Sequence, residues 1–268
     1  MNRFAIFGVP RSGTSWLSQI CNSHPDVTMR FQPLFSYTHK GRLKENSTAK
    51  EINKFFEEIR ETSDPFVLMS SAAHRNYPRF LKSSTPTHLG FKETRYLNII
   101  ENLIRRRPDV KIIGIIRNPL AVLASWVNAP KEYDKKWDFH TEWRFAHSKN
   151  SNRPEEFYGF SKWKETAENF LKYESLYPEQ FKLIRYDFLN SNPEEATVDL
   201  FRFVNLKLHS QVRKFIVDSK SIHDANPYSV FRAKANDRQW REVIPQDIQH
   251  QIEEELANSP LYKFYVAD

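Results

Sequence analysis

The residues best suited to chemistry lie in a turn near the N-terminus, Gly8–Ser15, which joins a short apolar run to an amphipathic segment. Amides at the start of a helix have no partner within it, and the helix dipole is positive there, so such a turn binds anions. The glycine spacing is that of a P-loop, but Thr14 replaces the lysine that reaches the β- and γ-phosphates in nucleotide triphosphatases. The only cation in the turn is Arg11. The pattern predicts a site for a nucleotide without a γ-phosphate; the alternative is an ordinary helix start capped by Ser12 and Thr14.

A second candidate site follows the continuous apolar run of residues 110–116, which is of the kind buried in parallel sheets. Arg117 comes directly after this run, and Pro119 suits the first position of a helix, where no amide hydrogen is needed. Ser125 lies two turns into that helix, on the side that its N-terminus faces, so it and Arg117 can hold one phosphate. The alternative is an arginine at the sheet edge and a serine on a helix face.

Together these segments resemble the sulfotransferases that use 3′-phosphoadenosine 5′-phosphosulfate (PAPS). In that family the counterpart of Pro10–Ser15 binds the 5′-phosphosulfate, and the counterparts of Arg117 and Ser125 bind the 3′-phosphate. The resemblance extends to Tyr186, whose family counterpart lies near the adenine, and to a basic loop near the C-terminus that contains Arg232 and Lys234. Trp16 is expected to contact either the adenine or the core. The implied product is adenosine 3′,5′-bisphosphate, and the implied cofactor-binding residues are Arg11, Ser12, Gly13, Thr14, Ser15, Trp16, Arg117, Ser125, Tyr186, Arg232 and Lys234.

Sulfuryl transfer from PAPS to a hydroxyl or amine is an in-line displacement, which needs cations at the leaving oxygen and a base for the acceptor's proton. We expect Arg11 to serve the leaving group, and Lys92 matches a lysine that the family places at a strand end. The cytosolic branch has its histidine base two residues later, where this chain has Thr94, which is too weakly basic. We therefore expect Glu93, at the same sheet edge, to be the base. The alternative for Glu93 is a salt bridge to Lys92 or Arg95.

The histidines offer further candidate bases, His39, His74 and His88, without support from their positions. His24 resembles a family element that ends the loop helix, and we expect it to cap that helix. No histidines show paired ligand spacing, and no carboxylate after a strand makes a convincing Mg²⁺ site beside the loop. We therefore expect no metal.

Length and composition predict one enzyme domain, residues 1–268, without a low-complexity linker. The 40 Lys and Arg against 33 Asp and Glu give a net charge of +7, which a bisphosphorylated cofactor explains in part. Because no long run of basic residues occurs, nucleic acid is not the expected partner. The single cysteine, Cys21, excludes an intramolecular disulfide and favours a reducing compartment. No apolar run is long enough to span a membrane, so we expect a cytoplasmic protein if Met1 is the natural start; oligomeric state stays open.

Helical patterns alternate with short apolar strands, which predicts a three-layer α/β/α fold with a central parallel sheet. Strands are expected near residues 3–8, 66–70, 88–93, 110–116 and 181–185. Helices are expected near residues 14–23, 49–62, 95–106, 119–128, 155–176, 191–204, 210–218 and 245–258. Residues 128–154 lack periodicity and form either a substrate-facing lid or a plain surface insertion.

The sequence thus predicts a PAPS-dependent sulfotransferase. The alternatives are a P-loop nucleotide kinase or phosphotransferase and a noncatalytic nucleotide- or RNA-binding protein. A kinase needs Mg²⁺ and a γ-phosphate contact, and Thr14 argues against both. Aromatic and cationic residues in 31–43 and 128–160 suit a sugar or an acidic oligosaccharide as acceptor, and suit a phenol or lipid alcohol almost as well.

Overall fold

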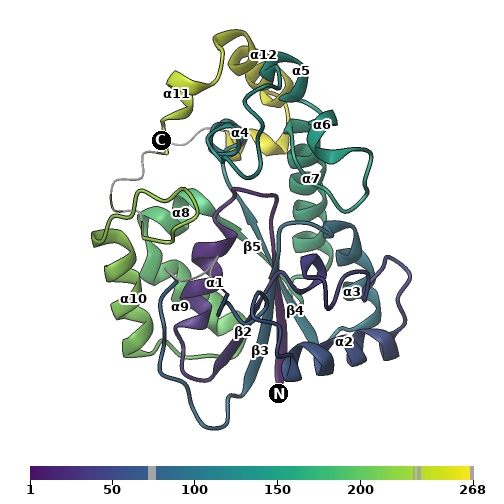
Figure 1. Cartoon of the computed structure of the whole chain (residues 1–268), viewed down its shortest axis with the longest axis vertical. Coiled ribbons are helices and arrows are strands. Elements are labelled where there is room, and N and C mark those ends of the chain that lie inside the picture. Colours follow the sequence, from purple (N-terminus) through teal and green to yellow (C-terminus); the bar gives the residue numbers. More distant parts are fainter. Residues whose placement is uncertain (72–76, 232, 234–236, 266–268) are drawn as a thin grey trace.

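A five-stranded parallel sheet lies at the centre of the computed structural model, which describes residues 1–71, 77–231, 233 and 237–265 (Figure 1). Its strands are β1 (Asn2–Phe7), β2 (Val27–Phe31), β3 (His88–Glu93), β4 (Val110–Ile116) and β5 (Phe181–Arg185). The strand order is β2-β3-β1-β4-β5, so β1 pairs with both β3 and β4. Connections run in opposite directions on the two sides of β1, and ligands of such sheets bind at the carboxyl ends of the strands near this reversal.

Alternate residues of β1 pack on opposite faces of the sheet, because side chains along a strand point to either side in turn. Phe4 and Ile6 join one hydrophobic cluster, whereas Ala5 and Phe7 join the other. Helices that cover the first face are α1 (Thr14–Asn22), α8 (Tyr186–Ser191), α9 (Pro193–Phe203) and α10 (Ser210–Ser221). Helices that cover the second face are α2 (Ala49–Glu61), α3 (Ile100–Arg106) and α7 (Phe160–Leu176). The expected three-layer α/β/α fold is confirmed.

The remaining described elements include several near the carboxyl edge of the sheet, toward the top of Figure 1. The helices are α4 (Pro119–Val127), α5 (Phe139–Glu142), α6 (His147–Asn150), α11 (Trp240–Val243) and α12 (Gln246–Leu256). Three short 3₁₀ turns are η1 (Pro33–Phe35), η3 (Leu97–Ile99) and η4 (Pro260–Phe264). The segment 128–154, which includes α5 and α6, buries Trp143 and Ala146 against the core. It is therefore packed onto the domain along part of its length.

Two strand predictions need correction. Residues 66–70 form a turn instead of a strand: Asp64 Oδ1 accepts a hydrogen bond from Phe66 N at 2.8 Å, and Leu68 N donates to the Asp64 carbonyl at 2.9 Å. The sheet instead contains β2, which the sequence did not reveal. The two segments meet where Phe31 N donates to the Val67 carbonyl at 2.9 Å, and Val67 and Met69 of the turn are buried beside the sheet edge.

Several helix boundaries also differ. The helix expected from residue 155 begins at Phe160, because Gly159 has a φ of 86° and breaks the helical path. The helix expected from residue 191 begins at Pro193, and the residues before it form the separate helix α8. The helix expected over residues 95–106 starts as the 3₁₀ turn η3. Among the described residues, no helix combines the length and apolar character needed to cross a membrane.

Candidate active site

The turn between β1 and α1 has the geometry of an anion site. Gly13 is the N-cap of α1 with a φ of 91°, no side chain caps the helix, and its first turn has no acidic residue. The first amides of α1 therefore have no side-chain cap within the part of the chain that the structure describes. Thr14 and Ser15 line the adjoining pocket, whereas Ser12 is buried and does not. The Ser12 hydroxyl has no hydrogen-bond partner among the described residues.

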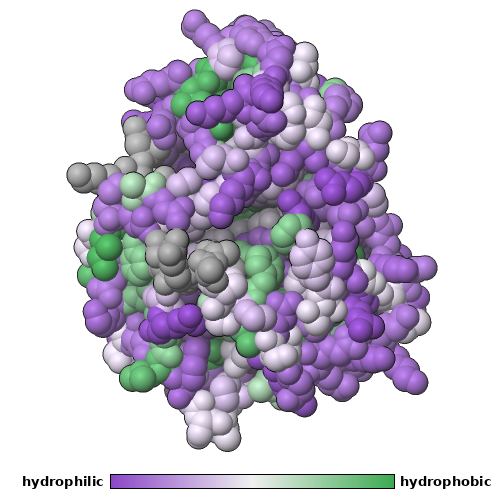
Figure 2. All heavy atoms as spheres, in the orientation of Figure 1, coloured by the Kyte–Doolittle hydropathy of each residue, from purple (hydrophilic) through white to green (hydrophobic). Residues whose placement is uncertain are grey.

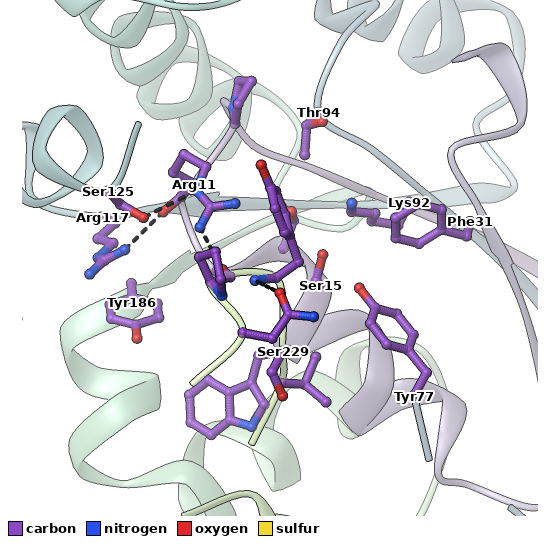
Figure 3. A pocket seen from close by; sticks show the side chains of 18 of the residues that line it. Arg11, Ser15, Phe31, Tyr77, Lys92, Thr94, Arg117, Ser125, Tyr186 and Ser229 are labelled. Atoms are coloured by element: carbon purple, nitrogen blue, oxygen red, sulfur yellow. Dashed lines mark hydrogen bonds between the residues drawn. The ribbon is translucent and has the colours of Figure 1, made fainter. Parts of the chain in front are cut away.

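Arg11 connects this turn to two distant segments (Figure 3). Its Nε donates to Ser125 Oγ on α4 at 3.1 Å, and its Nη2 donates to the Pro227 carbonyl at 2.8 Å. Nη1 lies 3.7 Å from Glu132 Oε1, and the guanidinium lies over the Tyr228 ring, 5.2 Å from its centroid. The structure thus brings Ser125, expected beside Arg117, into direct contact with Arg11.

Arg117 lies directly next to Arg11 at the end of β4. Its Nη1 donates to the Arg11 carbonyl at 2.9 Å, and its guanidinium lies over the Tyr186 ring, 4.7 Å from the centroid. Its Nε donates to Asp237 Oδ1 at 2.7 Å, and Nη2 binds the same oxygen. A carboxylate of this chain therefore neutralises the arginine that was expected to hold the 3′-phosphate.

Two aromatic side chains mark the end of the pocket next to α8 and α10. Trp16 and Tyr186 meet edge to face, with centroids 6.3 Å apart. Trp16 Nε1 donates to Ser219 Oγ at 2.9 Å, and Asn190 and Lys220 also line this end. Tyr186 packs so closely on Gly13 that a Cβ there would lie 2.5 Å from its ring. Ring faces bordered by polar groups suit a purine base.

The pocket has a volume of about 400 Å³ and extends from these aromatic residues past the turn to β3. Figure 3 shows its two ends: Arg11, Arg117, Ser125 and Tyr186 gather on one side, and Lys92 lies with Phe31 on the other. In the space-filling view this face is mainly hydrophilic, with apolar side chains beside a hollow near its middle (Figure 2). A pocket with anion-binding groups at one end and a lysine at the other can hold a nucleotide together with a second molecule.

Lys92 reaches the pocket although its side chain is almost wholly buried, with 1% of the residue exposed. Its ammonium lies over the Phe31 ring, 4.2 Å from the centroid, and has no hydrogen-bond partner among the described residues. Burial lowers the pKa of Lys92 to about 7, although the nearby carboxylates Glu93 and Glu132 act in the opposite direction. An anionic ligand beside it would favour the charged form.

Glu93 does not line the pocket, in contrast to the role expected from the sequence. It pairs in register with Phe7 of β1, whereas Lys92 pairs with Ile6, so the two side chains lie on opposite faces of the sheet. Glu93 Oε1 accepts a hydrogen bond from Leu34 N at 2.7 Å, and burial raises the pKa of Glu93 to about 8. This arrangement anchors η1 and gives the carboxyl no contact with the pocket. The alternative salt bridge is not formed either, since Arg95 pairs with Glu156 at 3.0 Å.

The described histidines lie away from the pocket lining. His39 Nε2 is hydrogen-bonded to Thr62 Oγ1, and His88 Nε2 to the Val204 carbonyl. His24 N donates to the Cys21 carbonyl in the last turn of α1 at 3.1 Å, and His24 Nδ1 accepts from Asp26 N, so His24 stabilises the turn that ends this helix. Three further expected site residues, His74, Arg232 and Lys234, lie outside the described residues. No cluster of three metal-ligating side chains occurs in the described part of the chain.

Several pocket residues were missed by sequence reasoning. They come from segments without a motif: Gln32 after β2, Tyr77, Glu132 after α4, and residues 226–230. Phe31, the last residue of β2, belongs to the aromatic residues that the sequence suggested for the acceptor. Gln32 Nε2 donates to Thr94 Oγ1 at 3.2 Å, which joins two of these segments at the end with Lys92. For Glu132 the signal was only its place in the aperiodic region 128–154.

The family is established by the sequence comparison: residues 4–210 match the profile of the sulfotransferase family, and the chain belongs to that family. This confirms the resemblance seen in the two phosphate-site motifs. Among curated proteins, it is similar to the nodulation protein NoeE of Sinorhizobium fredii, with 27% identity over 124 residues. That match covers 45% of this chain and 30% of NoeE, so the chain matches about a third of that relative.

Solved sulfotransferase structures share the fold. Mouse sulfotransferase SULT7A1 complexed with PAP superposes with a TM-score of 0.59 at 16% identity, covering 98% of this chain and 87% of that one. A sulfotransferase from Alicyclobacillus acidocaldarius has a TM-score of 0.55 at 14% identity and covers 100% of this chain and 97% of that one. At these identities the likeness shows the fold alone.

Proposed function

We propose that the protein transfers a sulfuryl group from PAPS to an acceptor hydroxyl or amine. The proposal rests on one observation: the two arginines expected at the 5′ and 3′ groups lie next to each other. Arg117 Nη1 donates to the carbonyl of Arg11, and both arginines line one pocket. An uncapped helix start beside them supplies amides for a phosphate. A nucleotide with anionic groups at both its 5′ and 3′ positions fits this pair. Mouse SULT7A1 of the same fold is described in complex with PAP.

The pocket residues divide between the parts of this cofactor. The 5′ group would be held by Arg11 and by the amides of Gly13, Thr14 and Ser15. Ser12 is buried, so it would shape the turn without contacting the ligand. Arg117 and Ser125 would hold the 3′-phosphate, and Trp16 and Tyr186 the adenine. Arg232 and Lys234 are assigned to the 3′-phosphate by the resemblance alone, since they lie outside the described residues. No metal takes part in this proposal.

PAPS supplies the sulfuryl group and a phosphate leaving group. Arg11 and Lys92 line the same pocket, and each would offer N–H donors to the leaving oxygen as charge develops on it. Lys92 needs its proton for this role, and its pKa of about 7 in the structure would rise beside the anionic donor. Burial of Lys92 excludes water from its sides, which strengthens the electrostatic contact.

The acceptor would enter at the end of the pocket that Lys92, Phe31 and Thr94 line. Aromatic and polar side chains are mixed there, which suits a hydroxylated ring such as a sugar or a phenol. We propose a small molecule or an oligosaccharide as the acceptor. Labelled PAPS with a panel of sugars, phenols and alcohols would identify its class.

The cofactor assignment is tested by comparing two ligands that differ in the 3′-phosphate. Arg117→Ala and Ser125→Ala should weaken adenosine 3′,5′-bisphosphate far more than adenosine 5′-phosphosulfate. Each charge-assisted contact contributes about 1.5–3 kcal/mol, so the affinity for the bisphosphate should fall roughly 10- to 100-fold in calorimetric titrations. Arg105→Ala, at an exposed position on α3, serves as a control for loss of charge. Equal weakening of both ligands would mean that the 3′ site is wrongly placed.

The same titrations separate the alternative functions. A sulfotransferase should bind adenosine 3′,5′-bisphosphate without Mg²⁺ and bind ATP weakly, whereas a kinase should bind ATP with Mg²⁺. An RNA-binding protein should instead bind RNA with an affinity that falls steeply with salt.

A further inference from the structure

We propose that Glu132 is the general base that takes the proton from the acceptor, an inference that rests on the proposed function. Glu132 lies in the segment after α4 and lines the pocket together with Arg11 and Lys92. It is one of two carboxylate-bearing candidates near the reacting end, and the other, Glu93, lies on the far face of the sheet. A base must stand within hydrogen-bond reach of the acceptor's proton, so position is the first criterion.

The backbone holds Glu132 firmly in place. Its N–H donates to the Ala129 carbonyl at 2.8 Å, and its own carbonyl accepts from Trp126 Nε1 at 3.1 Å. Trp126 and Ala129 are buried in the core, so the main chain at Glu132 is tied to the end of α4. The helix that carries Ser125 therefore also fixes the position of this carboxylate. A base fixed in this way needs no large reorganisation when the acceptor binds.

The two carboxylate oxygens of Glu132 have different surroundings. Oε1 lies 3.7 Å from Arg11 Nη1, beyond normal hydrogen-bond length. Oε2 is buried and has no hydrogen-bond partner among the described residues. Buried carboxylate oxygens are normally paired, so an unpaired one at a pocket wall needs an explanation. Rotation of the carboxyl group about its last side-chain bond would bring this oxygen to the pocket, where a hydroxyl or amine of the acceptor would supply the missing partner.

The charged surroundings suit this role. Arg11 lies beside Glu132, and the Glu132 carboxylate also acts electrostatically on Lys92 and Lys149. Burial raises the pKa values of Tyr158 and Tyr228, and Glu132 adds to this effect. Arg11 and Lys92 line the same pocket as Glu132, so two basic side chains share this end of the pocket with the carboxyl group. In the proposed transfer Arg11 and Lys92 would stabilise the charge that develops on the leaving phosphate oxygen, while the proton leaves the acceptor on the opposite side of the sulfur.

The step balances without another reactant. The acceptor oxygen forms a bond to sulfur while the bond from sulfur to the 5′-phosphate oxygen breaks, and the electron pair of that bond stays with the phosphate. The acceptor's proton passes to Glu132 and then to water. The products are the sulfated acceptor, adenosine 3′,5′-bisphosphate and one proton. No oxidant, reductant or metal enters the balance.

Glu132→Gln tests the proposal, because glutamine keeps the size and loses the basicity. With labelled PAPS, and with water, an alcohol and a phenol as acceptors, we expect turnover to fall by about 10²–10⁴, the usual range for a lost base. The loss should be smallest for the most acidic phenol, since an acceptor that is already ionised needs no base. Glu165→Gln, at a partly exposed position on α7, is the matched control and should turn over like the parent.

Calorimetry with adenosine 3′,5′-bisphosphate supplies a readout that does not depend on turnover. Glu132→Gln should bind it at least as tightly as the parent, because the variant lacks an anion close to Arg11. Equal turnover of the parent and Glu132→Gln on every acceptor, water included, would overturn the assignment, and so would an affinity loss large enough to account for the slower rate. If the parent itself fails to bind the bisphosphate, the proposed function fails instead of the assignment.

Discussion

Lys92 and Glu93 illustrate how one residue of register separates two chemical roles. Both are almost fully buried ionisable residues at the end of β3, yet only Lys92 faces the pocket. The sequence placed them at the same sheet edge, which is correct. It could not predict which face of the sheet each side chain occupies. Side chains alternate along a strand, but the face is known only once one residue is paired with a known neighbour, here Lys92 with Ile6 on β1.

The burial of Glu93 has a measurable effect on stability. Burial raises the pKa of this carboxyl from its ordinary value of 4.5 to about 8, so the folded chain keeps a proton that the unfolded chain releases. Its contribution to stability is therefore present below pH 4.5 and is lost as pH rises toward 8. We expect Glu93→Gln to gain a few kcal/mol in free energy of unfolding, relative to the parent, between about pH 5 and pH 9. Denaturant titrations at several pH values measure this difference.

Glu51 provides a control of opposite sign. Hydrogen bonds from the backbone and side chain of Thr48 at the start of α2 lower the pKa of Glu51, so its contribution is present at neutral pH and is lost in acid. Glu51→Gln should therefore lose stability relative to the parent as pH rises from acid toward neutral. A Glu93→Gln curve that runs parallel to that of the parent would show that Glu93 is ionised in the folded protein at neutral pH.

At the scale of elements, residues 226–230 form part of the pocket wall and contact Arg11 in the turn between β1 and α1. The Pro227 carbonyl accepts from Arg11, and the Tyr228 hydroxyl accepts from Lys131 N at 2.9 Å. Further along the same segment, Asp237 binds Arg117. A carbonyl and a carboxylate of this chain thus occupy the two arginines assigned to the cofactor, and a phosphate must compete with them.

Asp237→Asn should therefore tighten the binding of adenosine 3′,5′-bisphosphate. Removing a competing charge of this kind favours the ligand by about 1–2 kcal/mol, which corresponds to roughly a tenfold gain in affinity. Adenosine 5′-phosphosulfate, which has no 3′-phosphate, should gain little. Asp199→Asn, at a half-exposed position on α9, is the control. Weaker binding of the bisphosphate by Asp237→Asn would instead show that Asp237 orients Arg117 for its ligand.

The success of sequence reasoning differed between elements for physical reasons. β1, β3, β4 and β5 lie within about a residue of their expected positions, because each is a short run of mainly apolar residues with a clear end. β2 is an edge strand of five residues with alternating burial, a weaker signal. Residues 66–70 are as apolar as a strand, but Asp64 and Pro65 start a turn there. The residues proposed to bind the phosphates could be named from the sequence because they follow strands. Glu132 and residues 226–230 could not, because only the tertiary fold brings their segments to the pocket.

At the scale of the whole molecule, the proposed cofactor site joins elements from both ends of the chain. Arg11 follows β1, Ser125 is on α4, and Pro227 lies beyond α10. A ligand bound here would therefore stabilise all of these elements together. This allows a test of the expectation that residues 1–268 form one domain. Binding to the folded state alone raises its stability by mass action.

Adenosine 3′,5′-bisphosphate at a hundred times its Kd should therefore raise the free energy of unfolding by about 2.7 kcal/mol. For a chain of this size the melting temperature should rise by roughly 5–10 °C, in a single transition. Differential scanning calorimetry measures both quantities, with Arg117→Ala at the same ligand concentration as the control. Two separate transitions, of which the ligand moves only one, would contradict the expectation of one domain.

The division of the pocket between different parts of the chain has a consequence for how such a protein can be altered. The anion-binding groups follow the central strands β1 and β4, whereas the groups around Lys92 come from β2, β3 and the segment after α4. Apart from the contact between Glu132 and Arg11, the residues that would touch an acceptor lie on other segments than those that would hold the donor. Grafting new sequence into residues 130–138, while keeping Glu132, is the natural route to an enzyme that modifies a chosen alcohol.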